Sequence, residues 1–346
     1  MPTPAQQGYR MPAEWEPHAA TWLSWPRPDG ISFPGAYAKI TPVFVKIVEA
    51  LVESEVVRIN IGEPELRAAV KRLLQHLPSD RVEFFDIPTN EPWCRDHGPI
   101  FVKKAKAPKL AVIDFGYNAW GWKYPPFDFD DDVPTKVARH FDLPVFDAGD
   151  FVLEGGSVDV NGAGTVLTTE SCLLNPNRNP ELDRKKIEQN LKDYLGVKQV
   201  VWLGDGIEGD DTDGHVDDIT RFVSADTVVT ALEEDEEDPN YEPLQANLHR
   251  LHEVRLHDGR PLHVLHLPMP PKIVREGQRL PASYANFYIA NSVVLLPVFH
   301  DPNDAWAESV LKEAFPTRKI VPIDCRELIW GLGAFHCLTQ QQPAAD

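Results

Sequence analysis

Short apolar segments recur along the whole chain, and they restrict its fold more than any other feature. Each has the length of a strand, is rich in β-branched or aromatic residues and is bounded by turn-forming residues, which is typical of largely buried strands. They lie at 57–61, 82–87, 100–102, 110–115, 152–153, 165–169, 200–203, 227–232, 262–267, 288–290, 293–299 and 319–323. Apolar residues at three- and four-residue spacing predict helices at 36–53, 63–76, 134–141, 180–195, 241–256 and 304–315. We therefore expect a mixed α/β fold.

The order strand, strand, helix, strand recurs loosely about five times, although no repeat is visible by residue identity. Proline makes up 32 of the 346 residues, about 9%, where roughly 5% is average. Because proline ends helices and central strands, this excess fits many turns between short elements. Length alone favours about two domains.

The charge of the chain restricts its partners. With 34 Lys and Arg against 53 Asp and Glu, the formal net charge is −19. A phosphate backbone must be met by clustered basic residues, so no nucleic-acid partner is expected. Negative charge favours small cationic ligands instead. One acidic run, 233–238, is expected to be a solvated loop between a strand and the next helix, with a polyamine-facing loop as the alternative.

The four cysteines lie far apart without a CxxC pair, so neither a zinc ribbon nor a disulfide framework is indicated. No run of 18 apolar residues occurs, and residues 1–18 lack the charged-then-apolar order of a signal peptide. We expect a cytoplasmic protein in a reducing compartment, without a membrane partner. A homodimer is possible, but the sequence does not determine the oligomeric state.

The densest cluster of chemistry-bearing residues is the segment 91–99, which leads into a predicted strand. Polar and aromatic residues before an apolar strand place Trp93, Arg95, Asp96 and His97 at the mouth of that strand, where sites often lie. The alternative is a turn bounded by prolines, in which the charged side chains satisfy local backbone groups.

A second cluster, 208–218, also leads into a strand-like segment, at 219–223. On an extended chain, His215 and Asp217 would point to the same face and Val216 into the core. That spacing suits a general acid/base and a carboxylate over one substrate.

Two metal-site alternatives compete for this cluster. Asp210, Asp211 and Asp213 are not followed by the ligand spacing and final Glu of an EF-hand. A transition-metal site would need a second His or a Cys at a partner spacing, and none is nearby. We therefore expect no metal.

The third candidate is Cys337, which follows His336 after a glycine-rich approach. A flanking imidazole or a helix start can lower the pKa of a thiol and make it a nucleophile. The alternative is a small buried apolar residue, which is how we interpret Cys94, Cys172 and Cys325. A fourth candidate, Glu154, stands before two glycines; it could line a cationic pocket or cap a turn.

Together these motifs resemble those of the agmatine deiminase and bacterial peptidyl-arginine deiminase family. The resemblance runs from Met11-Pro-Ala-Glu-Trp-Glu-Pro-His18 and Trp22-Leu-Ser-Trp-Pro26 through Trp93-Cys-Arg-Asp-His-Gly-Pro99, Glu154-Gly-Gly156 and Gly214-His-Val-Asp217 to His336-Cys-Leu-Thr-Gln-Gln-Gln342. It implies a five-bladed pseudo-symmetric α/β propeller of ββαβ units, and one deiminase domain over residues 1–346 in place of two.

The resemblance also implies roles for single residues. Cys337 is expected to be the nucleophile, His215 the general acid/base, and Asp96 and Asp217 the carboxylates that hold a guanidinium. The chemistry agrees, because a planar guanidinium needs paired acceptors along its edges. Attack of the thiolate, loss of ammonia and hydrolysis of a covalent thiouronium would need neither a metal nor another cofactor.

The implied substrate is a small cationic guanidine. Agmatine is our first expectation, since Trp93, Glu154 and Asp211 could bind its free amine; peptidyl-arginine and free arginine are alternatives, and an amidinotransferase and a non-catalytic binding protein are rivals of other classes. The chain departs from the family in the nucleophile loop, where Gly331-Leu-Gly-Ala-Phe335 replaces the usual Gly-Gly-Gly-Asn-Ile. The missing Asn argues against an orienting role for that position.

Overall fold

Short strands gathered in several small sheets make up most of the fold, which a computed structural model describes for residues 2–345. The strands are β1 (His18–Ser24), β2 (Val56–Asn60), β3 (Val82–Phe85), β4 (Ile100–Lys103), β5 (Leu110–Gly116), β6 (Val145–Val152), β7 (Asp159–Val160), β8 (Thr165–Thr169), β9 (Gln199–Leu203), β10 (Thr220–Ser224), β11 (Thr227–Leu232), β12 (His263–Pro268), β13 (Val274–Arg275), β14 (Gln278–Arg279), β15 (Tyr288–Ile289), β16 (Val293–Val298), β17 (Lys319–Asp324) and β18 (Thr339–Pro343).

The helices are α1 (Tyr37–Leu51), α2 (Pro64–Leu73), α3 (Cys94–His97), α4 (Ala119–Trp122), α5 (Asp128–Asp131), α6 (Val133–His140), α7 (Glu170–Leu173), α8 (Arg184–Leu195), α9 (Tyr241–Glu253), α10 (Asn303–Ala314) and α11 (Phe335–Leu338). The 3₁₀ turns are η1 (Ala5–Gln7), η2 (Gly155–Ser157), η3 (Val216–Asp218) and η4 (Leu328–Gly331). The expected mixed α/β fold is confirmed. Within residues 2–345, no helix combines the length and the apolar character needed to cross a membrane.

Five sheets share one strand order, in which an antiparallel pair is followed by a parallel pair. They are β18-β1-β2-β3, β4-β5-β6, β7-β8-β9, β10-β11-β12 and β15-β16-β17. The first sheet joins both ends of the chain, because Trp22 of β1 pairs with Gln340 of β18. The hairpin β13-β14 stands apart from these five.

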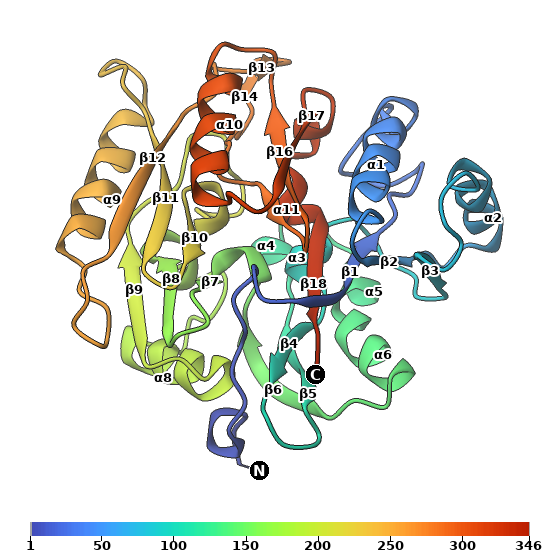
Figure 1. Cartoon of the computed structure of the whole chain (residues 1–346), viewed down its shortest axis with the longest axis horizontal. Helices are drawn as coiled ribbons and strands as arrows, with labels where there is room; N and C mark the ends of the chain where they lie inside the picture. The colour runs from blue at the N-terminus through green and yellow to red at the C-terminus, as the bar shows by residue number, and fades with distance from the viewer. Residues whose placement is uncertain (1, 346) are drawn as a thin grey trace.

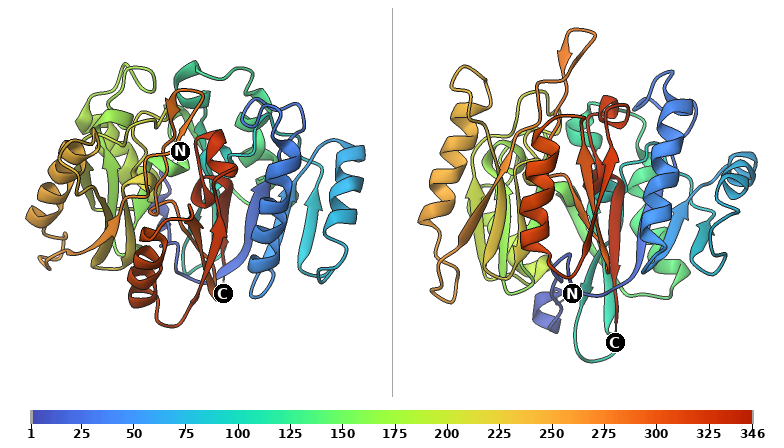
Figure 2. Two further views of the ribbon diagram at one scale, coloured as in Figure 1. Left: turned by 90° about the horizontal axis from the view of Figure 1, so that it is seen from above. Right: turned by 45° about the horizontal axis from the view of Figure 1, so that its top comes forward.

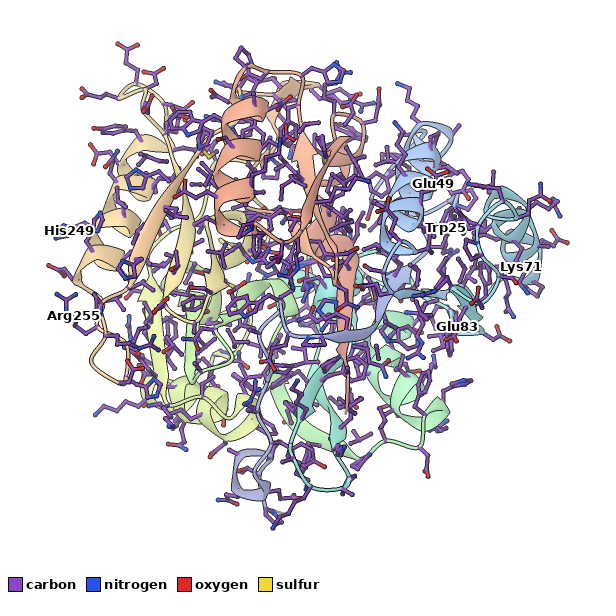
Figure 3. The ribbon with its side chains drawn as sticks, in the orientation of Figure 1. Trp25, Glu49, Lys71, Glu83, His249 and Arg255 are labelled. Atoms are coloured by element: carbon purple, nitrogen blue, oxygen red, sulfur yellow. The ribbon has the colours of Figure 1, made fainter. Side chains whose placement is uncertain are left out.

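The parallel strands are joined by helical crossovers, as parallel pairing requires. Helices α1, α6, α8, α9 and α10 lie in these connections and are on the outside of the molecule in Figures 1 and 2. The short helices α3, α4 and α11 lie near the centre of Figure 1. Figure 3 shows Lys71 of α2 and His249 of α9 at the outer edge, where both side chains are exposed.

The middle strands of the sheets are buried on both faces, which explains why they stand out in the sequence as continuous apolar runs. Val228, Val229, Thr230 and Ala231 of β11 are all at most 1% exposed. Each predicted strand overlaps a strand of the structure, although 152–153 meets only the last residue of β6.

The prediction was wrong at the start of one helix. The helix predicted from residue 180 begins at Arg184, because the Asp183 side chain accepts a hydrogen bond from the backbone N–H of Lys186 and caps it there. The acidic run at 233–238 lies between β11 and α9, as expected, and is mostly exposed, although Asp238 pairs with Arg279 at 2.7 Å.

Strand β18 escaped prediction because its sequence is polar, although all five of its residues are buried. Two of its three glutamines have hydrogen-bond partners inside the protein. The amide oxygen of Gln342 accepts from Trp22 and Arg58, and that of Gln341 accepts from Arg95. Buried polar side chains with such partners do not oppose strand formation.

Candidate active site

A cavity of about 160 Å³ lies among the short central helices. Asp96 of α3, Trp120 of α4 and Cys337 of α11 each contribute to its wall. The cavity combines apolar and acidic surface. Its apolar lining is Ile31, Pro34, Trp93, Trp120, Trp330 and Leu332, and its acidic lining is Glu91, Asp96 and Asp211. Such a lining suits a cationic ligand with an aliphatic part.

Cys337 reaches this cavity with its thiol between an amide and a carboxylate. Asn286 Nδ2 donates to Cys337 Sγ at 3.0 Å, and the thiol donates to Asp217 Oδ2 at 3.7 Å. Burial raises the pKa of the Cys337 thiol well above its usual value, and the charges of Asp217, Asp218 and Asp96 raise it further. The thiol is therefore protonated while the pocket holds no cation.

Asp96 presents its carboxylate to the cavity from a fixed orientation. Oδ1 accepts from the backbone N–H of Gly156 at 2.9 Å, and Oδ2 accepts from Trp120 Nε1 at 3.0 Å. Burial raises the pKa of Asp96, although the nearby His215 counteracts part of this rise. The placement of Asp96 at the mouth of a strand agrees with the sequence, since α3 directly precedes β4.

His215 and Asp217 are not part of the cavity lining and are fully buried, but Asp217 Oδ2 lies 3.7 Å from the thiol of Cys337, which does line the cavity. The extended conformation expected for this segment is wrong: Val216–Asp218 forms the turn η3. Asp210 fixes the segment just before this turn, because its Oδ2 accepts from the backbone N–H groups of Gly214 and His215. Val216 is nevertheless in the core, as expected.

The two side chains still come together, around Gly156. A Cβ atom at Gly156 would lie 2.6 Å from His215 Nδ1, 2.8 Å from Asp96 Oδ1 and 3.0 Å from Asp217 Oδ2. Only a glycine lets the backbone approach these three groups so closely. His215 Nδ1 is also 3.7 Å from Asp96 Oδ1.

The charge environment of His215 favours its protonated form. Burial would lower the pKa of this imidazole, but the charge of Asp96, the neighbouring Cys172 and the charge of Glu154 together raise it well above its usual value. His215 is thus an imidazolium that can donate a proton at neutral pH.

His336 has a different role from the one the sequence suggested. Its Nδ1 lies 2.6 Å from Asp217 Oδ2, and its Nε2 lies 2.8 Å from Glu14 Oε2. The ring of His336 therefore bridges two carboxylates and does not contact the thiol through a hydrogen bond. The expectation that this flanking imidazole lowers the pKa of the Cys337 thiol is therefore wrong. It lowers the pKa of Asp217 instead, against the effect of burial.

The predicted residues for the substrate tail differ in their position. Trp93 and Asp211 line the cavity, and the Tyr124 hydroxyl donates to Asp211 Oδ2. Glu154 does not line it; this side chain is fully buried, accepts from Arg178 Nε at 2.6 Å and lies 4.0 Å from His215 Nε2.

Within residues 2–345, the donor atoms of Glu154, Cys172 and His215 form the only group of three that could hold a metal ion, all within 4.8 Å of one another. Arg178 already binds Glu154 there. A metal cation would have to compete with this guanidinium in a fully buried position, so the donor set fits a resident metal poorly.

Sequence reasoning missed Trp120, Asn286 and Glu14 as contributors to the site. Trp120 stands in an aromatic-rich segment next to a glycine, which was a usable signal. Glu14 lies in the first motif of the family resemblance. Asn286, which also accepts from the backbone N–H of His336 and Cys337, has no signal in its neighbourhood.

Comparison with known proteins identifies relatives along the whole chain. An agmatine deiminase of Pseudomonas aeruginosa is 40% identical, over 99% of this chain and 97% of its own. The structure of the Enterococcus faecalis agmatine deiminase covers 100% of this chain and 99% of its own, with a TM-score of 0.93 and 36% identity. A C. jejuni agmatine deiminase variant with substrate bound covers 96% of each chain, with a TM-score of 0.88 and 33% identity. Residues 10–343 match the model of the Porphyromonas-type peptidyl-arginine deiminase family, and the chain belongs to this family.

Proposed function

We propose that this protein is an agmatine deiminase, which hydrolyses the guanidinium of agmatine to N-carbamoylputrescine and ammonia. One observation carries the proposal: the cavity holds both the Cys337 thiol and the Asp96 carboxylate, with Asp217 Oδ2 3.7 Å from Cys337 Sγ. A thiol between two carboxylates suits attack on the carbon of a planar cation that both carboxylates hold by its edges. The similarity to agmatine deiminases supports this choice.

The bound substrate supplies the charge that activates the nucleophile. Burial and the neighbouring carboxylates keep the Cys337 thiol protonated in the free protein, and a guanidinium between the carboxylates offsets their charge and lowers the pKa of the thiol. The thiol then releases its proton to solvent, and the thiolate attacks the guanidinium carbon.

His215 moves the protons of both half-reactions. As an imidazolium it protonates the departing nitrogen of the tetrahedral adduct, so that ammonia leaves and a Cys337 thiouronium remains. The now neutral His215 takes one proton from water as the water oxygen attacks the thiouronium. Collapse of this adduct breaks the C–S bond, and its remaining hydroxyl proton returns to the Cys337 sulfur, which leaves the ureido product and the thiol. In this scheme the charge of Glu154 favours the imidazolium form of His215, because Glu154 lies 4.0 Å from His215 Nε2 and does not line the cavity.

The acidic lining of the cavity favours agmatine over free arginine. The free amine of agmatine is a cation at neutral pH and suits Asp211, whereas the α-carboxylate of arginine would lie near Asp211 and Glu91 in the same cavity. Peptidyl-arginine lacks both charges at that position and stays an alternative substrate.

The repeated strand order supports further parts of the proposal. Each of the five sheets would be one blade of a propeller with the site at its centre, and residues 1–346 would form one catalytic domain. A cytoplasmic location and homodimer formation remain predictions from the sequence.

The test compares kcat/KM for agmatine, arginine and an arginyl peptide, with ammonia and ureido product measured together. We expect agmatine to be the best substrate, with one ammonia per ureido product and no need for an acceptor amine. An amidinotransferase would instead need the amine, and a best substrate without a guanidine would refute the proposal.

Two variants and a chelator sharpen this test. Cys337→Ala should abolish ammonia release, whereas Cys325→Ala, which alters another buried thiol, should retain it. Turnover by Cys337→Ala would contradict the assigned nucleophile. Activity should persist after exhaustive chelation.

A further inference from the structure

Leu332 occupies a backbone conformation that favours glycine. Its φ is 69° and its ψ 20°, at the end of η4, where its N–H donates to the carbonyl of Ile329 at 2.9 Å. A side chain is disfavoured at such a left-handed position. Gly331 and Gly333 stand on either side, and neither has a positive φ. Of these three residues, Leu332 alone carries a side chain, although its backbone conformation is the one that favours glycine.

Packing explains the two glycines but not the leucine. A Cβ at Gly331 would lie 2.4 Å from the ring of Phe33, and a Cβ at Gly333 would lie 2.6 Å from the ring of Trp93. These rings hold the loop tightly, just before the helix that carries Cys337. Space therefore demands glycine at 331 and 333, whereas the backbone alone would prefer it at 332.

Leu332 lines the cavity, as do Cys337 and Trp330, and it is only partly buried. A strained residue that persists next to a site points to a role of its side chain there. What the side chain adds is apolar surface, in a cavity whose acidic groups Asp96 and Asp211 suit the two charged ends of a ligand.

We propose that Leu332 is a specificity-determining residue that packs against the aliphatic chain between the guanidinium and the far end of the substrate. This inference rests on the proposed function, because it takes the substrate to be an alkylguanidine. Leu332 selects for the length of that chain, since each methylene that it covers is removed from water.

The experiment measures kcat/KM for methyl-, ethyl-, propyl- and butylguanidine, which lack the amine and differ only in chain length. In the unaltered protein, kcat/KM should rise up to about fourfold with each methylene that becomes buried. In Leu332→Gly and Leu332→Ala this rise should fall to about twofold or less per methylene, so that butylguanidine loses most and methylguanidine least.

Thermal unfolding separates this effect from a structural one. Both variants lose the packing of Leu332 against the core, but only Leu332→Gly relieves the left-handed strain, so its Tm should be higher than that of Leu332→Ala. Asp142→Gly is the matched control, since Asp142 has a φ of 51° and does not line the cavity. It should leave the dependence on chain length unchanged.

The outcomes distinguish the two proposals. If the unaltered protein hydrolyses the guanidines and the Leu332 variants keep its full rise per methylene, the role of Leu332 is refuted and the proposed function stands. If the unaltered protein releases ammonia from no guanidine, including agmatine, the proposed function itself is refuted. A reduced rise in both Leu332 variants, but not in Asp142→Gly, supports the inference.

Discussion

Replacing Glu14 by Gln tests whether the buried charges behind the site hold the fold together. The Glu14 carboxylate accepts from Arg221 and from the Ile289 backbone N–H through Oε1, and from Arg95 and His336 through Oε2. Those charges lower the pKa of Glu14 well below its usual value, despite the opposing effect of burial. A glutamine keeps the shape but turns an NH₂ donor towards other donors and removes the negative charge.

The expected loss follows from the burial of these groups. Removing one partner of a buried ion pair costs about 3–5 kcal/mol, because the remaining charge stays buried. An unfolding entropy of about 2.1 cal/mol/K per residue gives roughly 0.7 kcal/mol/K for a chain of this length, so Tm should fall by about 4–7 °C.

Glu16→Gln is the matched control from the same segment. Glu16 pairs with Arg10 at 2.6 Å and Lys103 at 2.8 Å, but its side chain is 21% exposed. Pairs of this kind contribute about 0–1 kcal/mol, so Tm should fall by no more than about 1.5 °C. Thermal unfolding of both variants by circular dichroism provides the comparison. The reasoning would be refuted if Tm fell equally in the two variants, or if it fell by less than about 2 °C in Glu14→Gln.

Three further predictions concern the site and its surroundings. Gly156→Ala should reduce kcat by about 10²-fold or more, because its Cβ would displace the ring of His215. Gly116→Ala should keep its kcat, because the added Cβ would meet nothing closer than 3.5 Å. A loss of kcat in both variants would contradict the steric argument. Because the pKa of His215 is raised well above its usual value, its acid form should persist above pH 6.5, and a fall of kcat/KM centred near pH 6.5 would contradict its role as acid. Despite burial, Asp130 raises the pKa of His97 to about 10. The stability that this pair contributes should be complete below pH 6.5 and lost as pH rises through about 10. Between these pH values, Tm of Asp130→Asn should depend less on pH than Tm of the unaltered protein.

The sequence predicts the middle strands of the sheets well because their burial on both faces leaves a local signal. Thr165–Thr169 and Thr227–Leu232 agree with the prediction at both ends. Strand β18 has no such signal, since the partners of Gln341 and Gln342 are side chains more than 200 positions away in the sequence. Local patterns carry no information on partners at that distance.

The same distinction applies to the site. The residues Trp93, Asp96, Asp211 and Cys337 were identified from motifs, and all four line one cavity. The position of Glu154 behind His215 depends on the packing of separate sheets and could not be read from its neighbours in the sequence.

Several buried carboxylates of this protein form ion pairs with its own arginine side chains, and Asp96 differs from them. Three buried arginine side chains lie against buried carboxylates: the pairs are Arg95–Glu14, Arg178–Glu154 and Arg221–Asp159. Asp96 has no arginine or lysine partner within the described chain; its oxygens accept from the backbone of Gly156 and from Trp120. Burial accordingly raises the pKa of Asp96, as it does that of the Cys337 thiol. A guanidinium bound in the cavity would lower the pKa of Asp96 and of the Cys337 thiol. The substrate would thus supply beside Asp96 the positive charge that arginine side chains supply beside the other buried carboxylates.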